Sequence, residues 1–205
     1  MTTEIKRPFI AGAILAGGDA RRMGGIPKGM LETCDGISVA ERLILELGRA
    51  DINDIAIIAN DRGPYARCGV PVIPDIRTGI GPLAGIETAL VHFTGRSDAV
   101  LFVPCDLPQI TADEFRALKQ AFRPAETPVV FARTADFFWH PLCAVVHNAL
   151  ATDISVAIDG GKRKVRDIWR LLDAVGVEFA EHSIFFNINS PADMDGWDKM
   201  RRGGT

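Results

Sequence analysis

Short apolar runs alternate with amphipathic segments along the 205-residue chain. Continuous apolar runs such as Val100–Val103 are typical of parallel strands that are covered by helices on both faces. By contrast, Val39, Leu43 and Leu47 repeat every four residues, which places them on one face of a helix. The pattern predicts strands at Phe9–Leu15, Asp54–Ala59, Val70–Ile73, Ala99–Val103, Val129–Ala132, Cys143–Val146 and Val175–Phe179.

Two sites carry helix-start signals. Thr111 and Glu114 form a capping box ahead of an apolar helical face. Ser190 followed by Pro191 predicts the start of a last helix, because Ser caps well and Pro suits the first helical position. Alternating strands and helices predict an α/β fold, a three-layer α/β/α sandwich with right-handed crossovers. With no repeat or interdomain linker in the sequence, we expect a single domain over residues 1–205.

A glycine-rich segment follows the first predicted strand. Its glycines and cations are Gly17, Gly18, Arg21, Arg22, Gly24, Gly25 and Lys28. Glycines let backbone N–H groups approach an anion closely, and nearby cations compensate phosphate charge. The segment matches neither Gly-x-x-x-x-Gly-Lys-Ser/Thr nor Gly-x-Gly-x-x-Gly. We interpret it as a nucleotide-phosphate loop, with an ordinary strand-to-helix turn as the alternative.

Three polar residues also follow predicted strands, namely Asn60, Asp75 and Asp106. In a parallel sheet, ligands lie outside the carboxyl ends of the strands, so these side chains could converge with the glycine loop. A carboxylate at position 106 suits Mg²⁺, which takes one or two carboxylates with water and phosphate oxygens. A turn or helix-capping role is the alternative for Asp106, and plain loop positions are the alternative for the other two.

The composition of the chain argues against several classes of binding partner. The net charge of −3 argues against general nucleic-acid binding, and no apolar run is long enough to span a membrane. The four cysteines are widely spaced and, with four scattered histidines, form no zinc pattern. We therefore expect a cytoplasmic protein with reduced cysteines, no nucleic-acid partner and no membrane association.

Several motifs in order resemble the molybdenum cofactor guanylyltransferases of the nucleotidyltransferase superfamily. The family opens with Leu-Ala-Gly-Gly-x-x-x-Arg-Met-Gly-Gly and a later lysine, matched by 15–18, 22–25 and Lys28. Further matches are Ala59-Asn60, Pro74-Asp75, Gly81–Gly85, Pro104–Pro108, His140-Pro141 and Asn187–Pro191. One position departs from the pattern, because Pro27 stands where the family has Asp before the lysine.

The resemblance implies a mostly parallel sheet with a Rossmann-like nucleotide-binding half. It also implies roles for individual residues. Asp106 would bind Mg²⁺ and the nucleotide phosphates, Lys28 the triphosphate, and Arg22 the departing pyrophosphate. Asn60 and Asp75 match positions that contact guanine or ribose, and Asn189, with Asn187, is a candidate further ligand of the metal or the acceptor. The nucleotide site as a whole would comprise Leu15, Ala16, Gly17, Gly18, Lys28, Asn60, Asp75 and Asp106.

The function expected from the resemblance is transfer of GMP from GTP to a molybdopterin-type cofactor, with Mg²⁺ and release of pyrophosphate. GTP and the cofactor would be the substrates, and molybdoenzymes or cofactor-pathway proteins would be partners. Cytidylyl transfer to the same cofactor is one alternative, although relatives of that kind tend to read Ala-Ala-Gly and Pro-Gly-Asp at 16–18 and 104–106. A sugar-1-phosphate nucleotidyltransferase and a non-catalytic nucleotide-binding module are the others.

Two further motifs could serve the acceptor. Phe137, Phe138 and Trp139 could stack on a flat ring system, or simply pack in a hairpin. The basic run 162–166 could hold an acceptor phosphate, or form a solvated helix start.

Overall fold

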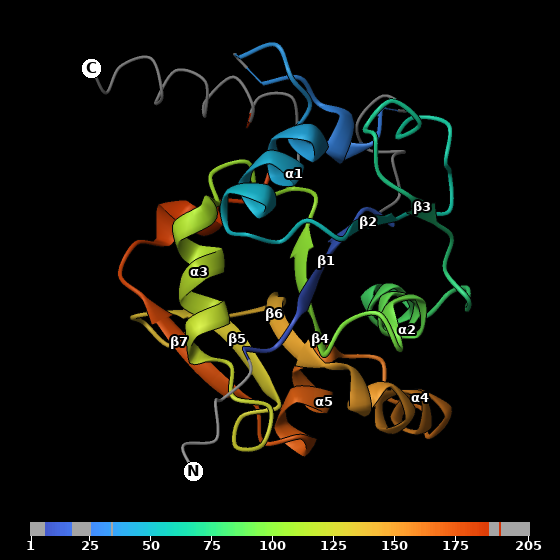
Figure 1. The fold of residues 1–205 in the computed structure, drawn as a ribbon, viewed down its shortest axis with the longest axis vertical. Coiled ribbons are helices and arrows are strands. Elements are labelled where there is room, and N and C mark those ends of the chain that lie inside the picture. Colours follow the sequence, from blue (N-terminus) through green and yellow to red (C-terminus); the bar gives the residue numbers. More distant parts are fainter. Residues whose placement is uncertain (1–6, 18–25, 34, 189–192, 194–205) are drawn as a thin grey trace.

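The computed structural model describes residues 7–17, 26–33, 35–188 and 193. These residues form one seven-stranded sheet with helices on both faces (Figure 1). The strands are β1 (Ile10–Leu15), β2 (Ile55–Ile58), β3 (Val72–Ile73), β4 (Ala99–Pro104), β5 (Val129–Thr134), β6 (Trp139–His147) and β7 (Val175–Phe179). The α-helices are α1 (Val39–Arg49), α2 (Pro82–Phe93), α3 (Ala112–Ala121), α4 (Ala151–Asp159) and α5 (Val165–Leu171). Short 3-10 helices are η2 (Lys28–Met30), η3 (Asn148–Leu150) and η4 (His182–Phe185).

The sheet is mostly parallel, as the sequence predicts. Its strand order is β3-β2-β1-β4-β6-β5-β7. The strands β3, β2, β1 and β4 form a continuous parallel half, and β5 and β7 are also parallel to each other. Only β6 pairs antiparallel with its neighbours β4 and β5 within the described sheet. The first four strands therefore form the Rossmann-like half.

All seven predicted strands are present, although the residues at which several of them begin and end differ from the prediction. The strand predicted at Cys143–Val146 extends to Trp139–His147, because its first residues pair with β5 in a hairpin and are only partly buried. Partial burial removes the apolar signal at these positions. At the opposite edge, β3 is only Val72–Ile73, shorter than the predicted run from residue 70.

Helices α1 and α3 cover one face of the sheet, and α2, α4 and α5 cover the other (Figure 1). Each face has its own apolar core. One core packs α1 and α3 against side chains such as Ile14, Leu43 and Phe115. The other packs α2, α4 and α5 against side chains such as Phe102 and Trp169. The three-layer α/β/α arrangement is therefore confirmed.

The predicted capping box at the start of α3 is present. The Thr111 side chain accepts from the first turn, and the Thr111 amide donates to Glu114 Oε2 at 2.8 Å. A second capping box starts α1, where Ser38 and Glu41 exchange the same bonds. Its Ser-x-x-Glu pattern is legible in the sequence. The helix predicted from Ser190 and Pro191 lies outside the described residues.

Cys68, Cys105 and Cys143 are all free thiols in the structure. Burial raises the pKa of the Cys105 thiol to about 12, with the neighbouring Asp106 charge adding to the effect. Cys105 is therefore a packing residue rather than a thiolate nucleophile at neutral pH. Cys34 lies outside the described residues. Within those residues, no helix has the length and apolar character needed to cross a membrane.

Candidate nucleotide site

Four candidate residues stand at equivalent positions along one edge of the sheet. Gly17 comes two residues after the end of β1, Asn60 two after β2, Asp75 two after β3, and Asp106 two after β4. The strand ends are in register, since Leu15 is the partner of both Ile58 and Pro104, and Ile58 is the partner of Ile73. The four residues therefore follow the strand order along the edge.

This row spans the parallel half of the sheet (Figure 1). Asp75 follows β3 at the outer edge, and Asp106 follows β4 at the centre, three strand spacings away. At about 4.8 Å per strand, the span is roughly 14 Å. A row of this length can engage different parts of one extended ligand at its two ends.

The same edge carries a cavity of about 330 Å³. Apolar and polar groups both contribute to its wall, as is usual for a small-molecule site. The lining residues are Leu15, Gly17, Lys28, Ile58, Asp75, Gly81, Pro82, Gly85, Pro104, Cys105, Asp106 and Leu142. The cavity therefore joins the ends of β1, β2 and β4 to the start of α2.

Asp75 is held by Asn60 at the outer end of the cavity. The Asn60 side-chain amide donates to Asp75 Oδ2, and the Asp75 backbone amide donates to Asn60 Oδ1, both at 2.9 Å. The other carboxylate oxygen, Oδ1, is buried and has no hydrogen-bond partner among the described residues. Burial raises the pKa of Asp75, and the bond from Asn60 partly offsets that rise. A buried acceptor without a donor on a cavity wall is suited to receive N–H or O–H groups from a ligand.

Glycines at 81 and 85 shape the wall beside Asp75. A Cβ at position 85 would lie 3.0 Å from Leu15 Cδ2 and 3.6 Å from Asp75 Oδ1, so a larger residue would crowd the cavity. Gly81, the N-cap of α2, has φ 71° and ψ −151°, a conformation that is essentially restricted to glycine. Pro82 then occupies the first turn of the helix. These residues bring the positive end of the α2 dipole to the cavity.

Lys28 and Asp106 form an ion pair at the other end of the cavity. The distance from Lys28 Nζ to Asp106 Oδ2 is 3.1 Å. Their side chains are 27% and 18% exposed, so the pair is shielded from bulk water and still reachable from the cavity. A cation and a carboxylate placed together can engage a phosphate and a divalent metal, respectively.

The short helix η2 explains how Lys28 reaches Asp106. Gly29 packs so closely that a Cβ there would lie 3.1 Å from both Cys105 Cβ and the Tyr65 ring. The absence of a side chain therefore lets this turn sit on the end of β4. Pro27 precedes the turn at φ −60°, which the proline ring favours, and its carbonyl accepts from Met30 N at 2.8 Å. Pro27 thus fits the backbone that presents Lys28, although it supplies no carboxylate.

The segment after η4 also reaches Asp106. The Ile188 backbone amide donates to the Asp106 carbonyl oxygen at 2.9 Å. Ile188 is buried and Asn187 is exposed, which places the neighbouring asparagine at the surface of this end of the site. Asn189, the other candidate ligand, lies outside the described residues, as do Gly18 and Arg22.

The donor set fits a magnesium ion bound largely through its substrate. Among the described residues, no group of three or more His, Cys, Asp or Glu side chains could enclose a metal. Mg²⁺ commonly uses one or two carboxylates and completes its octahedron with water and phosphate oxygens. Asp106 can provide one such carboxylate beside Lys28.

The structure brings most of the predicted site residues together, with two differences of position. Leu15, Gly17, Lys28, Asp75 and Asp106 line the cavity. Ala16 is buried, and its amide donates to the Ile58 carbonyl, so it continues the sheet. Asn60 acts through Asp75. The sequence analysis missed the wall residues Ile58 and Leu142, whose apolar side chains carry no chemical signal; the position of Leu142 directly after His140-Pro141 is the only hint.

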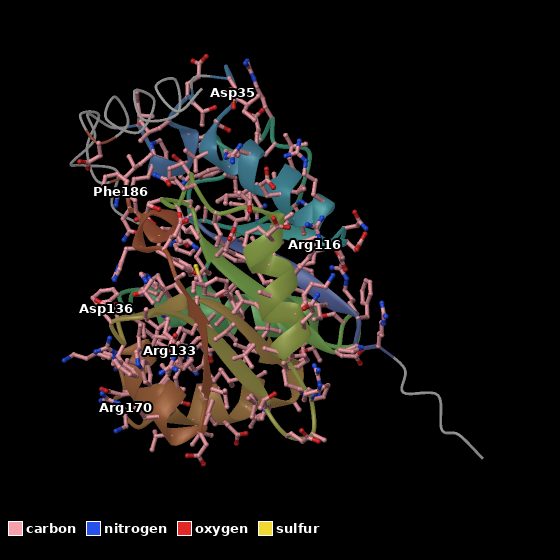
Figure 2. The ribbon with its side chains drawn as sticks, turned by 90° about the vertical axis from the view of Figure 1, so that its left-hand side faces the viewer. Asp35, Arg116, Arg133, Asp136, Arg170 and Phe186 are labelled. Carbon is pink, nitrogen blue, oxygen red and sulfur yellow. The ribbon has the colours of Figure 1, made fainter. Side chains whose placement is uncertain are left out.

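The two candidate acceptor motifs meet beside the β5–β6 hairpin. The Arg166 and Arg170 guanidinium groups lie 5.2 and 5.6 Å from the centre of the Trp139 ring. Figure 2 shows Arg133, Asp136 and Arg170 together on one side of the molecule, away from Arg116 of α3. Within the basic run, Arg163 donates to the Ile158 carbonyl and so caps the end of α4. Of the three aromatic residues, only Trp139 therefore packs against α5, whereas Phe137 and Phe138 are exposed beside Arg133 and His140. In the basic run, Arg166 contacts Trp139 and Arg163 caps α4.

Comparison with known proteins agrees with this geometry. The family model described as the MobA-like NTP transferase domain matches residues 12–175, from β1 to β7. The chain belongs to this family. It is therefore a nucleotidyltransferase, and the cavity stands at the sheet edge where such a fold places a nucleotide.

Individual relatives cover almost the whole chain. A molybdenum cofactor guanylyltransferase from Yersinia pestis is 34% identical over 200 residues, covering 96% of this chain and 99% of the relative. The crystal structure of molybdopterin-guanine dinucleotide biosynthesis protein A from Archaeoglobus fulgidus superimposes with a TM-score of 0.70 at 23% identity, covering 94% and 99% of the two chains. A nucleotidyl transferase from Methanothermobacter gives a TM-score of 0.73 at 15% identity, covering 96% and 99%. These two structures support the fold.

Proposed function

We propose that this enzyme transfers GMP from GTP to a molybdopterin-type cofactor, releasing pyrophosphate in a Mg²⁺-dependent reaction. The main support is the Yersinia pestis guanylyltransferase, which matches nearly end to end at 34% identity. The site geometry adds a specific observation, the row that runs from Asp75, whose Oδ1 has no hydrogen-bond partner within the described part of the chain, to the ion pair at Asp106. The molybdopterin-type cofactor and GTP are the substrates. We place the reaction in the cytoplasm and assign it to a single domain. Molybdoenzymes or cofactor-pathway proteins would receive the product.

Asp75 is suited to recognise guanine. Guanine presents N–H donors at N1 and at its 2-amino group, and a carboxylate is an acceptor on both oxygens. Oδ1 of Asp75 is buried and receives no donor from the residues that the structure describes, so it is suited to accept such a group, while Asn60 already donates to Oδ2. Cytosine presents a single amino donor beside an acceptor nitrogen, which would face the carboxylate unfavourably. The sequence Ala16-Gly17-Gly18 favours the guanylyl reaction on independent grounds.

Lys28 and Asp106 are suited to the phosphate chemistry. In the reaction, a phosphate oxygen of the acceptor forms a bond to the α-phosphorus of GTP, and the bond from that phosphorus to the bridging α–β oxygen breaks. Pyrophosphate leaves with the electron pair. Asp106 would hold Mg²⁺, which supplies charge neutralisation at the phosphates when bound. Lys28, 3.1 Å from Asp106, adds a positive charge, and Arg22 is proposed to contact the departing pyrophosphate.

The proposed reaction needs no strong base or nucleophile from the protein. The acceptor phosphate is already ionised at neutral pH, so the site must position two phosphates and neutralise their charge. Cys105, the thiol on the cavity wall, stays protonated because its pKa is about 12. Asn187 and Asn189 are proposed to complete the metal or acceptor contacts at the Asp106 end.

Nucleotide binding tests this proposal. Thermal unfolding is measured with GTP, CTP, ATP and UTP, each with and without Mg²⁺. A ligand at 100 times its Kd stabilises the fold by about 2.7 kcal/mol, which corresponds to an increase in Tm of roughly 5–10 °C for a chain of this size. We expect GTP to give the largest shift and Mg²⁺ to increase it. An equal or larger shift with CTP would replace the guanylyl assignment by the cytidylyl one.

A further inference from the structure

Three consecutive residues of the loop between β3 and α2 are each bonded to a different part of the fold. Asp75 exchanges two hydrogen bonds with Asn60 after β2. The Ile76 amide donates to Thr88 Oγ1 of α2 at 3.0 Å. Arg77 then extends toward α2 and α4, which lie next to each other in Figure 1. A loop that follows a two-residue edge strand is thereby fixed by side chains rather than by the sheet.

Arg77 makes the most extensive of these contacts. Its Nε lies 2.7 Å from Glu87 Oε2 of α2, its Nη2 donates to Ser155 Oγ of α4 at 2.8 Å, and its Nη1 pairs with Asp159 at the end of α4. The planar guanidinium fork thus joins one loop to two helices. The hydrogen bond with Asp159 and the contact with Glu87 raise the pKa of Arg77, and Arg77 in turn lowers the pKa of Asp159.

The buried carboxylate of Glu87 requires a nearby positive charge, which Arg77 supplies. The Glu87 side chain is only 3% exposed, and a buried carboxylate is costly unless a cation accompanies it. Arg77 is 28% exposed and supplies that charge from the loop. The loop is therefore drawn onto α2 by electrostatics as well as by hydrogen bonds.

Both ends of this loop belong to the cavity wall. Asp75 stands two residues before Arg77, and Gly81 and Pro82 stand at the start of α2. We propose that Arg77 is a positioning residue that ties the β3–α2 loop to Glu87, Ser155 and Asp159, and so holds Asp75 where it receives the nucleotide base. This role rests on the proposed function of Asp75. It also means that helix α4 influences nucleotide affinity, although α4 lies outside the cavity wall.

The critical variants are Arg77→Lys and Asp159→Asn. Lysine can retain the charge beside Glu87, but it cannot at the same time donate to both Ser155 and Asp159, which accept from the two Nη groups of Arg77. Asp159 is 63% exposed and lies outside the cavity wall, so its replacement is expected to perturb folding little and to act on the cavity through its hydrogen bond with Arg77. Arg96→Lys is the matched control, because Arg96 pairs with Asp54 at 2.7 Å before β2, at the opposite end of that strand from Asn60.

Two measurements are made on the full-length enzyme with its acceptor and Mg²⁺. The first is steady-state kinetics in GTP. We expect Arg77→Lys to raise KM for GTP about tenfold with kcat within about twofold, equivalent to about 1.4 kcal/mol of nucleotide binding. Asp159→Asn should give a smaller rise of the same kind, and Arg96→Lys none. The second is hydrogen–deuterium exchange without nucleotide. The peptide spanning 74–81 should exchange faster in Arg77→Lys than in the wild type, and at the wild-type rate in Arg96→Lys.

The outcomes separate this inference from the proposed function. Unchanged exchange in the 74–81 peptide of Arg77→Lys overturns the positioning role, whatever nucleotide the enzyme uses. Normal KM in both variants, with Asp75→Asn weakening GTP binding, overturns the positioning role and leaves base recognition intact. If Asp75→Asn binds GTP as well as the wild type does, base recognition by Asp75 fails, and with it the consequence we assign to Arg77.

Discussion

At the scale of single residues, two aspartates at similar positions have different surroundings. Asp75 is held by a neutral amide and keeps one buried oxygen without a partner among the described residues. Asp106 stands 3.1 Å from a lysine ammonium. A carboxylate with an unsatisfied oxygen suits a neutral N–H donor, whereas a carboxylate beside a cation suits the charged end of a nucleotide with its metal. The two ends of the site are thereby specialised.

Asp106→Asn tests the charged end. Asparagine preserves size and turn-forming ability but removes the charge that would hold Mg²⁺. We expect transfer to fall by at least about 100-fold, while Tm stays within a few degrees of the wild type. Pyrophosphate release and thermal unfolding of both proteins provide the check. Activity within a few-fold of the wild type would show that Asp106 is a turn residue.

The pH dependence of GTP binding tests Asp75. Burial raises its pKa, so on acidification this carboxylate is protonated before an ordinary aspartate. We expect GTP affinity to fall as pH drops through that raised pKa, because the protonated oxygen loses acceptor capacity. Protonation of Asp75 does not itself destabilise the fold, since its folded pKa exceeds its unfolded one. Thermal unfolding at each pH separates loss of GTP binding from acid unfolding through carboxylates with lowered pKa values, such as Glu41.

Titration calorimetry across the acidic range measures this effect. Asp75→Asn is the control, since it retains every source of pH dependence other than Asp75 itself. Identical pH profiles for the two proteins would remove Asp75 from base recognition.

Residues with chemical signatures could be found from the sequence, and residues that act through packing could not. Lys28 and Asp106 stand in recognisable motifs, and the structure places them within 3.1 Å of each other. Nothing in the sequence marks Arg77 as important, because its partners Glu87 and Asp159 are 10 and 82 positions away along the chain. Gly29 matters for its close approach to Cys105 and Tyr65, and that contact exists only once the chain is folded.

At the scale of elements, the start of α2 is a decisive feature of the site. Gly81 caps this helix in a conformation that other residues rarely adopt, and Gly81, Pro82 and Gly85 line the cavity. The helix dipole then directs partial positive charge to the site. The first two turns of α2 also include Thr88, whose Oγ1 accepts a hydrogen bond from the Ile76 amide and so ties the preceding loop to this helix.

Gly81→Ala is expected to weaken nucleotide binding. Alanine is strained at φ 71° and ψ −151°, at a cost of about 1–3 kcal/mol, so the turn must shift the start of α2. Gly95→Ala is the matched control, because Gly95 has φ 74° beyond the other end of the same helix. A Cβ would meet open space at both positions. Both variants should lose stability in thermal unfolding, and only Gly81→Ala should raise KM for GTP several-fold; equal KM values in the two variants would contradict this role for Gly81.

Elements were predictable where burial is complete and less so where it is partial. The run Val100–Val103 is fully buried within β4, so its continuous apolar pattern located the strand well. The first residues of β6 are partly exposed and pair across a hairpin, so the predicted strand began four residues late. The antiparallel direction of β6 has no signature in that apolar run, since direction is set by the connections.

At the scale of the whole molecule, the sheet has two halves with different constructions. The parallel half β3-β2-β1-β4 carries the row from Asp75 to Asp106. The half formed by β6, β5 and β7 carries the aromatic hairpin, and Arg166 and Arg170 of α5 lie over its Trp139 ring. Arg133, Asp136 and Arg170 of this half lie together in Figure 2. Leu142 of β6 lines the nucleotide cavity and so connects the halves. We assign the nucleotide to the first half and expect the acceptor to approach from the second.

The most direct test is the transfer reaction of the purified enzyme. GTP labelled at the α-phosphate is supplied with molybdopterin cofactor and Mg²⁺, and both pyrophosphate and labelled acceptor are measured. We predict one pyrophosphate for each labelled acceptor, a rate with GTP at least about 100-fold above that with CTP, as expected when a mismatched base leaves a buried polar group unpaired, and no release without acceptor. Faster transfer from CTP, or tight GTP binding with no labelled acceptor formed, would contradict the assignment of this site to guanylyl transfer.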